Sequence, residues 1–253
     1  MAGHIYIGGD THGNSNDLRT LFMQIENPTK DDVLIITGDA GFEYGHYVMG
    51  AAKKTALKFP GTIIVIRGNH DNRYWADHTI DGKPASNSWN FVEDENGNRY
   101  LRQKKYPNIW YVPDEGCIYN IKGYNFMFIP GAYSVDKWYR LQNGYPYCDD
   151  EQLTDEEREN LYKQAQETQV DFVIAHTFPQ KIVEGHLRYL FLRGLDQSMV
   201  DRSQEIWLDK MAEIFENQPT FKHYFGGHYH DSKELTDKYT ILYHTVIDIE
   251  DYI

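Results

Sequence analysis

The sequence predicts an α/β fold built on a parallel sheet, and the order of elements in residues 4–66 is the evidence. Three short apolar runs, residues 4–7, 33–37 and 62–66, are each followed within two residues by a glycine and have the length of buried strands. Two segments with the apolar spacing of a helix, 16–26 and 46–59, lie between them. Strand, helix, strand, helix, strand is the order of βαβ units, whose strands are parallel.

Residues 72–150 differ from this pattern because they are rich in Tyr, Trp, Asn and Gly. The dipeptide at 96–97 is typical of a hairpin turn, and residues 122–125 separate two alternating runs, 117–121 and 126–129. We therefore expect antiparallel strands that form a second sheet. The aromatic side chains of this segment either stack on an aromatic leaving group or pack loops onto the sheet, and packing is favoured for most of them.

The last part of the chain returns to strands alternating with helices. Thr154 and Glu157 have the spacing of a capping box, which predicts a polar helix to about residue 168. A second helix is expected at 203–216, with Ile206 and Met211 among its inward side chains. Strands are expected at 170–175, 221–225 and 240–247. Because no repeat or linker interrupts the pattern, we expect residues 1–253 to form one domain.

Composition narrows the class of protein. With 41% hydrophobic and 25% charged residues, the chain is not a disordered, collagen-like or coiled-coil protein. The net charge of −13 disfavours long nucleic acid and anionic membrane surfaces as partners. Cys117 and Cys148 lie in no paired motif, and we see neither a signal peptide nor a run long enough to span a membrane. We expect free thiols and a cytoplasmic protein.

Side chains that bind metals follow five of the predicted strands. The candidate ligands are Asp10, His12, Asp39, Asn69, His176, His228 and His230. In α/β sheets, ligands bind beyond the carboxyl ends of the strands, so these side chains are expected to converge at one edge. Seven ligands are too many for one tetrahedral ion but suit two ions. A two-metal site needs a bridging ligand with two oxygens, and Asp39 is the natural candidate.

The donor types indicate which metals would bind. Imidazole, carboxylate and amide oxygen suit manganese, iron, zinc or cobalt, and they do not suit a metal that prefers thiolate. We expect two divalent or mixed-valence ions, manganese or iron ahead of zinc, cobalt, nickel or magnesium. Two such ions keep a positive surplus beside two carboxylates, which can bind and polarise a phosphate.

The ordered motifs resemble one known family. Asp10-Thr-His12, Gly38-Asp39, Gly68-Asn69-His70-Asp71, His176 and Gly227-His228-Tyr-His230 are similar in type and order to the motifs of the calcineurin-like metallophosphoesterases. The resemblance covers residues 8–230. It implies a four-layer α/β/β/α sandwich of two mixed sheets and an enzyme that hydrolyses a phosphate ester with metal ions.

The resemblance also implies roles for individual residues. One metal would be held by Asp10, His12 and His230, the other by Asn69, His176 and His228, with Asp39 shared. His70 would protonate the leaving oxygen or stabilise charge on the phosphate. Asp71 would either orient the ring of His70 or make a structural contact. Asn69 and His70 are candidate phosphate contacts, and Arg67 would either touch phosphate or belong to a buried structural pair.

One motif departs from the protein phosphatases of the same superfamily. Their second motif reads Gly-Asp-x-Val-Asp-Arg-Gly, whereas Phe42 and Glu43 stand at the later Asp and Arg positions here. The expected substrate is therefore a small phosphomonoester rather than a phosphoprotein. The alternatives are a phosphodiesterase that acts on a nucleotide or cyclic nucleotide, and a scaffold that kept the fold without the chemistry. The complete ligand set disfavours the scaffold.

Overall fold

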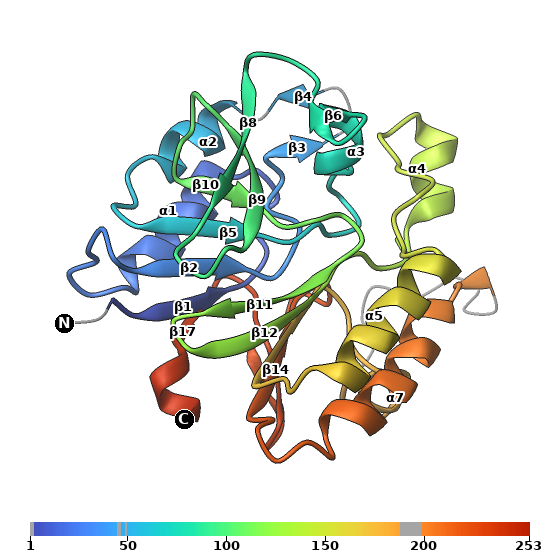
Figure 1. The fold of residues 1–253 in the computed structure, drawn as a ribbon. Coiled ribbons are helices and arrows are strands. Elements are labelled where there is room, and N and C mark those ends of the chain that lie inside the picture. Colours follow the sequence, from blue (N-terminus) through green and yellow to red (C-terminus); the bar gives the residue numbers. More distant parts are fainter. Residues whose placement is uncertain (1–2, 45–46, 49, 188–198) are drawn as a thin grey trace.

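The computed structural model describes residues 3–44, 47–48, 50–187 and 199–253 (Figure 1). Two large mixed sheets lie face to face, and helices cover their outer surfaces. This arrangement is the four-layer α/β/β/α sandwich that the sequence resemblance implied. Both sheets have a central set of parallel strands with antiparallel strands at their edges.

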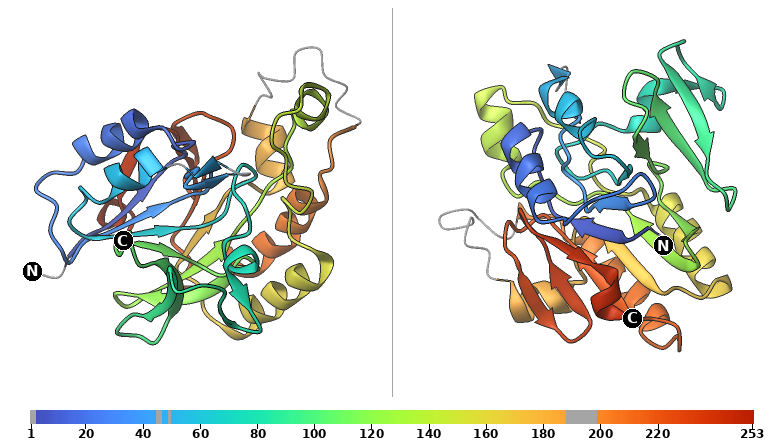
Figure 2. Two further views of the ribbon diagram at one scale, coloured as in Figure 1. Left: turned by 90° about the horizontal axis from the view of Figure 1, so that it is seen from above. Right: turned by 90° about the vertical axis from the view of Figure 1, so that its left-hand side faces the viewer.

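The first sheet has the strand order β17-β1-β2-β5-β10-β9-β8. Its strands are β1 (Ile5–Gly8), β2 (Val33–Ile36), β5 (Thr62–Val65), β8 (Trp89–Glu93), β9 (Arg99–Gln103), β10 (Ile109–Tyr111) and β17 (Val246–Asp248). Strands β1, β2, β5 and β10 are parallel neighbours, whereas β17, β9 and β8 pair antiparallel. The β8–β9 hairpin stands out from the body of the molecule in the right-hand view of Figure 2.

The second sheet has the strand order β11-β12-β13-β14-β16-β15. Its strands are β11 (Cys117–Ile121), β12 (Tyr124–Ile129), β13 (Phe172–Ala175), β14 (His223–Gly226), β15 (Lys233–Thr236) and β16 (Tyr239–Ile241). Strands β12, β13, β14 and β16 run parallel. Two small hairpins, β3–β4 (Glu43–Tyr44 and Tyr47–Val48) and β6–β7 (Thr79–Ile80 and Lys83–Pro84), lie outside both sheets.

Seven α-helices occur in the described part of the chain. They are α1 (Ser15–Met23), α2 (Gly50–Ala56), α3 (Tyr74–His78), α4 (Lys137–Asn143), α5 (Asp155–Glu167), α6 (Gln180–His186) and α7 (Ser203–Phe215). A 3₁₀ helix, η3 (Ile249–Tyr252), follows β17. Helices α1 and α2 pack on the first sheet, and α5, α6 and α7 pack on the second. Helix α4 projects beside these layers (Figure 1).

Successive side chains of a strand point to opposite faces of its sheet, and this alternation produces three apolar layers. In β2, Leu34 and Ile36 face the helices of the first sheet, whereas Ile35 faces the second sheet. In β13, Phe172 joins Ile35 in the layer between the sheets, and Val173 faces the helices of the second sheet. Both sheets are therefore buried on both faces, which is why their central strands read as unbroken apolar runs.

Most of the predicted elements are confirmed. The turn at 96–97 connects β8 to β9, and the turn expected at 122–125 connects β11 to β12, which already begins at Tyr124. The expectation that residues 72–150 form one second sheet is wrong. Strands β8, β9 and β10 extend the first sheet, because the short apolar strand β10 pairs in parallel with β5. The tail also divides, since β16 lies in the second sheet and β17 pairs with β1.

The expected inward face of α7 is confirmed for Met211, which is buried, and is wrong for Ile206. Ile206 is 48% exposed, whereas Gln204 and Glu205 are buried. The side chain of Gln204 accepts from the backbone N–H of Leu153 and donates to the carbonyls of 130 and 131. Because these hydrogen bonds replace those that water would make, polar side chains take inward positions that an apolar pattern assigns to others.

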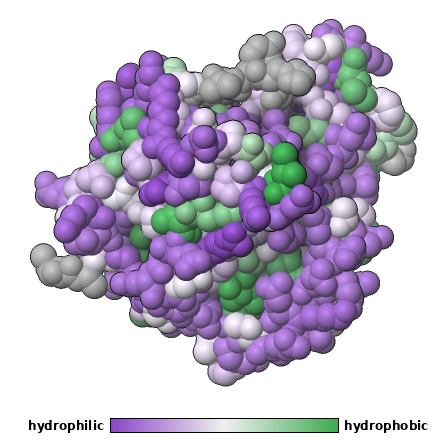
Figure 3. Space-filling model, turned by 45° about the horizontal axis from the view of Figure 1, so that its top comes forward, coloured by the Kyte–Doolittle hydropathy of each residue, from purple (hydrophilic) through white to green (hydrophobic). Residues whose placement is uncertain are grey.

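The face shown in Figure 3 is mostly hydrophilic, with hydrophobic residues in small separate patches. The aromatic residues of segment 72–150 divide into buried and exposed members. Tyr74, Tyr100 and Tyr111 are fully buried, whereas Trp138 and Tyr139 on α4 are about half exposed. Packing thus accounts for the buried members.

Among the described residues, no helix has both the length and the apolar character that a membrane span requires.

Candidate metal centre

All seven predicted metal ligands meet at the edge where the parallel strands of both sheets end. Asp10 and His12 follow β1, Asp39 follows β2, and Asn69 follows β5. From the second sheet, His176 follows β13, and His228 and His230 follow β14. The carboxyl ends of the strands thus bring together residues from both halves of the chain.

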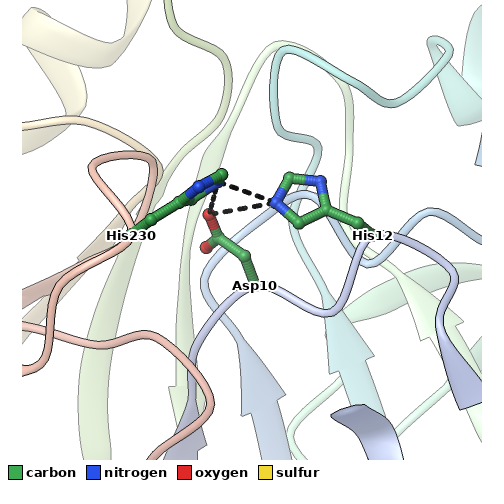
Figure 4. Close-up of side chains that lie close together, drawn as sticks. All are labelled: Asp10, His12 and His230. Atoms are coloured by element: carbon green, nitrogen blue, oxygen red, sulfur yellow. Dashed lines mark hydrogen bonds and ion pairs between the residues drawn. The ribbon is translucent and has the colours of Figure 1, made fainter. Parts of the chain in front are cut away.

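Asp10, His12 and His230 form a first cluster (Figure 4). Their side chains point toward one another from two loops that belong to different sheets. Oδ2 of Asp10 lies 3.9 Å from Nε2 of His12 and 3.9 Å from Nε2 of His230, and the two ring nitrogens are 2.9 Å apart. The three ligand atoms are close enough to share one cation.

Asn69, His176 and His228 form a second cluster. Oδ1 of Asn69 lies 2.9 Å from Nε2 of His176 and 2.9 Å from Nδ1 of His228. Nδ1 of His176 lies 2.9 Å from the carbonyl oxygen of Thr37, to which it must donate. In a neutral ring, Nε2 then carries no proton and faces an amide oxygen that also lacks one. Two lone pairs that face each other need a positive charge between them.

Asp39 lies between the two clusters. Its Oδ1 accepts a hydrogen bond of 2.8 Å from the backbone N–H of His70. Its Oδ2 lies 3.7 Å from Nδ1 of His12 and 3.4 Å from Nε2 of His176. One carboxylate oxygen therefore faces ligands of both clusters, which is the geometry that a shared ligand requires.

The titration of the buried groups also fits cation binding. Burial, together with the negative charge of Asp39, raises the pKa of Asp10 to about 8. Oδ1 of Asp10 has no hydrogen-bond partner among the described residues. Burial alone would lower the pKa of His176, but Asp39 and Asp10 raise it to about 9. A proton on His176 and one on Asp10 thus supply positive charge that a cation would replace.

Four of the seven predicted ligands have a left-handed backbone. The residues with positive φ are His12 (46°), Asp39 (47°), His228 (70°) and His230 (52°). Non-glycine residues rarely adopt this conformation, and each such residue costs of order 1–3 kcal/mol. The fold therefore maintains unfavourable backbone geometry at the positions that aim donor atoms at the site.

Two glycines allow the backbone to approach the buried carboxylates. A Cβ on Gly68 would lie 2.0 Å from Oδ1 of Asp39, and a Cβ on Gly227 would lie 2.0 Å from Oδ1 of Asp10. No side chain fits at these distances. These close approaches explain why glycine precedes Asn69 and His228 in the motifs.

His70 lies beside the ligands on the wall of a cavity of about 290 Å³. Its Nε2 is 3.9 Å from Oδ2 of Asp39 and 3.3 Å from Nη2 of Arg140. Burial lowers the pKa of His70 to about 4, and the positive charge of Arg140 acts in the same direction, whereas Asp39 opposes it. The free ring is therefore neutral at pH 7.

Arg140 is a cavity residue that the sequence did not predict. It comes from α4, in the aromatic-rich segment, and its side chain reaches the cavity together with Asp136 and Val135. Nε of Arg140 lies 2.7 Å from Oδ2 of Asp136, and its guanidinium also contacts the hydroxyl of Tyr44. No motif marks this arginine, because only the packing of α4 brings it to the ligand loops.

Asp71 and Arg67 make structural contacts. Oδ1 and Oδ2 of Asp71 accept hydrogen bonds from the backbone N–H groups of Gly41 and Gly68, which join the loops after β2 and β5. Arg67 is 1% exposed and donates to the carbonyl oxygens of Asp150 and Glu151. Of the alternatives that the sequence left open, these contacts favour the structural one for both residues.

Comparison with known proteins identifies the family of the chain. The sequence model of the family described as calcineurin-like phosphoesterase matches residues 3–232. No curated protein matches the chain. Among solved structures, the chain is similar to AQ665, a protein of unknown function from Aquifex aeolicus. The identity is 14% and the TM-score 0.43, over 98% of this chain and 97% of the other.

Proposed function

The chain belongs to the calcineurin-like phosphoesterases, and from this premise we propose that it hydrolyses small phosphomonoesters with two bound metal ions. Membership of the family implies metal-dependent hydrolysis of a phosphoester, and the family usually binds two metal ions. The observation that carries the choice of a monoester is the position of Arg140, whose guanidinium lies beside His70 on the wall of the ligand cavity.

We assign the ligands as the two clusters divide them. Asp10, His12 and His230 would hold one ion, and Asn69, His176 and His228 the other, with Asp39 shared. When bound, such ions attract the phosphate and lower the pKa of an attacking water. Nitrogen and oxygen donors of this mixture suit manganese or iron, and also zinc and cobalt.

His70 is the proposed acid or charge-stabilising group. Its ring faces the cavity and takes part in neither of the two proposed ligand sets. The ring is neutral in the free protein, but a phosphate dianion brings negative charge beside it and favours its protonated form. A protonated His70 can then donate to a phosphate oxygen or to the leaving oxygen.

Arg140 is the proposed phosphate clamp. A guanidinium offers two parallel N–H groups to two oxygens of one phosphate. A monoester presents three terminal oxygens and up to two negative charges, whereas a diester presents two oxygens and one charge. An arginine on the wall of the ligand cavity therefore stabilises a monoester more than a diester. The ion pair with Asp136 holds the guanidinium in place for this contact.

The test compares kcat/KM between two substrates, between metals, and between the wild type and an Arg140 variant. Protein loaded in turn with Mn, Fe, Zn or Mg is assayed for kcat/KM on an aryl monophosphate and on an aryl diester, with elemental analysis of each sample. We expect a higher kcat/KM for the monoester. Arg140→Ala should reduce it by about 10–100-fold, the range for one charge-assisted contact, and reduce the diester value less. Arg19→Ala, on an exposed face of α1, is the control.

Two results would contradict the proposal. A kcat/KM for the diester that equals or exceeds that for the monoester would reassign the enzyme as a phosphodiesterase. Metal-loaded protein that hydrolyses neither ester would favour the scaffold.

We also infer a cytoplasmic enzyme, in keeping with the sequence expectation, because both of its cysteines are free thiols.

A further inference from the structure

Asn69 is linked to two buried residues outside the ligand clusters. Nδ2 of Asn69 donates a hydrogen bond of 2.8 Å to Oγ of Ser134, and the backbone N–H of Ser134 donates one of 2.9 Å to Oε1 of Glu151. The side chain of Ser134 also favours the charged form of the Glu151 carboxylate and so opposes the rise of its pKa. Ser134 is 1% exposed and Glu151 is 2% exposed. The chain Asn69–Ser134–Glu151 is thus enclosed by protein.

The direction of these hydrogen bonds decides which end of the Asn69 amide faces the ligand cluster. An asparagine side chain can bind a cation through Oδ1 but not through Nδ2, whose two hydrogens carry positive charge. The two ends are alike in shape, so rotation of the amide by 180° costs little unless a neighbour distinguishes oxygen from nitrogen. Ser134 makes this distinction when its oxygen acts as an acceptor.

The Glu151 carboxylate, whose Oε1 lies 2.9 Å from the backbone nitrogen of Ser134, is the nearby acceptor to which the Ser134 hydroxyl hydrogen can point. A hydroxyl has one hydrogen, and when that hydrogen points to the carboxylate, the lone pairs of Oγ are left for Nδ2 of Asn69. Burial raises the pKa of Glu151 to about 7, and the bonds from Ser134 act against this. Oε1 is an acceptor in both protonation states, because the proton can reside on Oε2, which has no hydrogen-bond partner in the described part of the chain.

Glu151 is itself held from several sides. The hydroxyl of Tyr147 donates to Oε1 over 3.3 Å, and Nη1 of Arg67 donates to the backbone carbonyl over 2.8 Å. A Cβ on Gly131 would lie 2.3 Å from the same carbonyl, so the chain packs closely there. The buried Arg67 therefore supports the segment that carries Glu151.

We propose that Ser134 and Glu151 are positioning residues that hold the Asn69 amide with Oδ1 toward His176 and His228, and thereby set the affinity of that cluster for its cation. The inference rests on the proposed role of Asn69 as a metal ligand. Partners of this kind behind a ligand typically change metal affinity by 10–100-fold when they are lost.

The test measures metal binding rather than turnover. Apo protein is titrated with Mn²⁺ by isothermal calorimetry, with elemental analysis of dialysed samples. In Ser134→Ala, we expect one equivalent to bind as in the wild type and the other to bind about 10–100-fold more weakly. Ser134→Thr, which keeps the hydroxyl, should restore part of the affinity. Glu151→Gln, which keeps an acceptor oxygen and the volume, should weaken the same equivalent by a smaller factor.

Thr240→Val is the matched control, because it removes another buried hydroxyl, which bonds His223 away from the clusters. It should lower Tm and leave both Mn²⁺ affinities unchanged. If Ser134→Ala and Glu151→Gln behave like this control, the positioning role is refuted. Failure to bind two equivalents in the wild type would also refute it. Wild-type protein that binds two ions but does not hydrolyse the monoester would refute the proposed function alone.

Discussion

Nε2 of His12 lies 2.9 Å from Nε2 of His230, although 218 residues separate them in the sequence. The two rings come from different sheets, and Oδ2 of Asp10 is 3.9 Å from both nitrogens. Two ring nitrogens at this distance either share a proton or would be bridged by a cation. Burial and the neighbouring ring lower the pKa of His230 to about 4, which favours the unprotonated ring that a metal binds.

Replacement of the shared ligand or of a ligand of one cluster is expected to abolish turnover, because the protein loses metal. Asp39→Asn removes the negative charge between the clusters, and His228→Ala removes a donor atom 2.9 Å from Oδ1 of Asn69. Elemental analysis after dialysis should show less bound metal in both variants. An Asp39→Asn protein that is free of metal and still turns over substrate at the wild-type rate would contradict the assignment.

His70→Ala is expected to separate chemistry from metal binding. Because His70 belongs to neither proposed ligand set, both ions should remain while kcat falls by roughly 10²–10⁴. Metal content and kcat are measured on the same sample. His186→Ala, on an exposed part of α6, is the control and should leave both unchanged. A parallel fall of metal content and rate would show that His70 is a ligand.

Gly68→Ala is expected to damage the site through the backbone. The new Cβ would lie 2.0 Å from Oδ1 and 2.4 Å from the backbone nitrogen of Asp39, so Asp39 must move. We expect a loss of about 1–3 kcal/mol in unfolding free energy, as for other overpacked sites, together with less bound metal. Denaturant unfolding and elemental analysis measure the two effects.

Gly185→Ala is the matched control for this substitution. Gly185 lies in α6, and a Cβ there would meet no atom within 4 Å. Because alanine favours the helix by about 1 kcal/mol relative to glycine, this variant should be equally or more stable. If Gly68→Ala behaves like Gly185→Ala, the close approach at Gly68 is not required.

His223 is expected to make the protein acid-sensitive. It is 3% exposed, and burial lowers its pKa from 6.5 to about 4. A neutral buried ring contributes stability above pH 6.5, and this contribution is lost as pH falls from 6.5 to 4, because the unfolded state takes up the proton first. A difference of this size corresponds to up to about 3 kcal/mol.

The measurement compares wild type with His223→Gln, which can still bond Oγ1 of Thr240. The difference between their unfolding free energies should change by up to about 3 kcal/mol between pH 7 and pH 4, with the variant losing less stability. Denaturant titrations at several pH values provide this difference. A pH-independent difference would mean that His223 is not buried as a neutral ring.

The sequence predicted which candidate ligands converge better than it predicted their surroundings. Asp10, Asp39 and His176 each lie at or shortly after the end of an apolar run, so the run locates the strand and the strand end locates the candidate ligand. Arg140 and Ser134 lie beyond β12 in a segment without regular periodicity. Their place depends on how that segment packs over the loops, which no local pattern encodes.

The assignment of strands to sheets failed for a related reason. Alternation predicts that residues 89–93 and 99–103 are strands but not which sheet they join, and β10 carries them into the first sheet. In α7, apolar spacing alone placed Ile206 inward, whereas hydrogen bonds bury Gln204 instead. In both cases the outcome depends on partners that are distant in sequence.

The division of the ligands between the sheets has a mechanical consequence. Asp10, His12 and Asp39 are anchored in the first sheet, whereas His176, His228 and His230 are anchored in the second. An ion held by both groups would act as a cross-link between the two halves of the sandwich. Separation of the halves would then require release of the ion, so occupancy would raise the cooperativity of unfolding as well as its free energy.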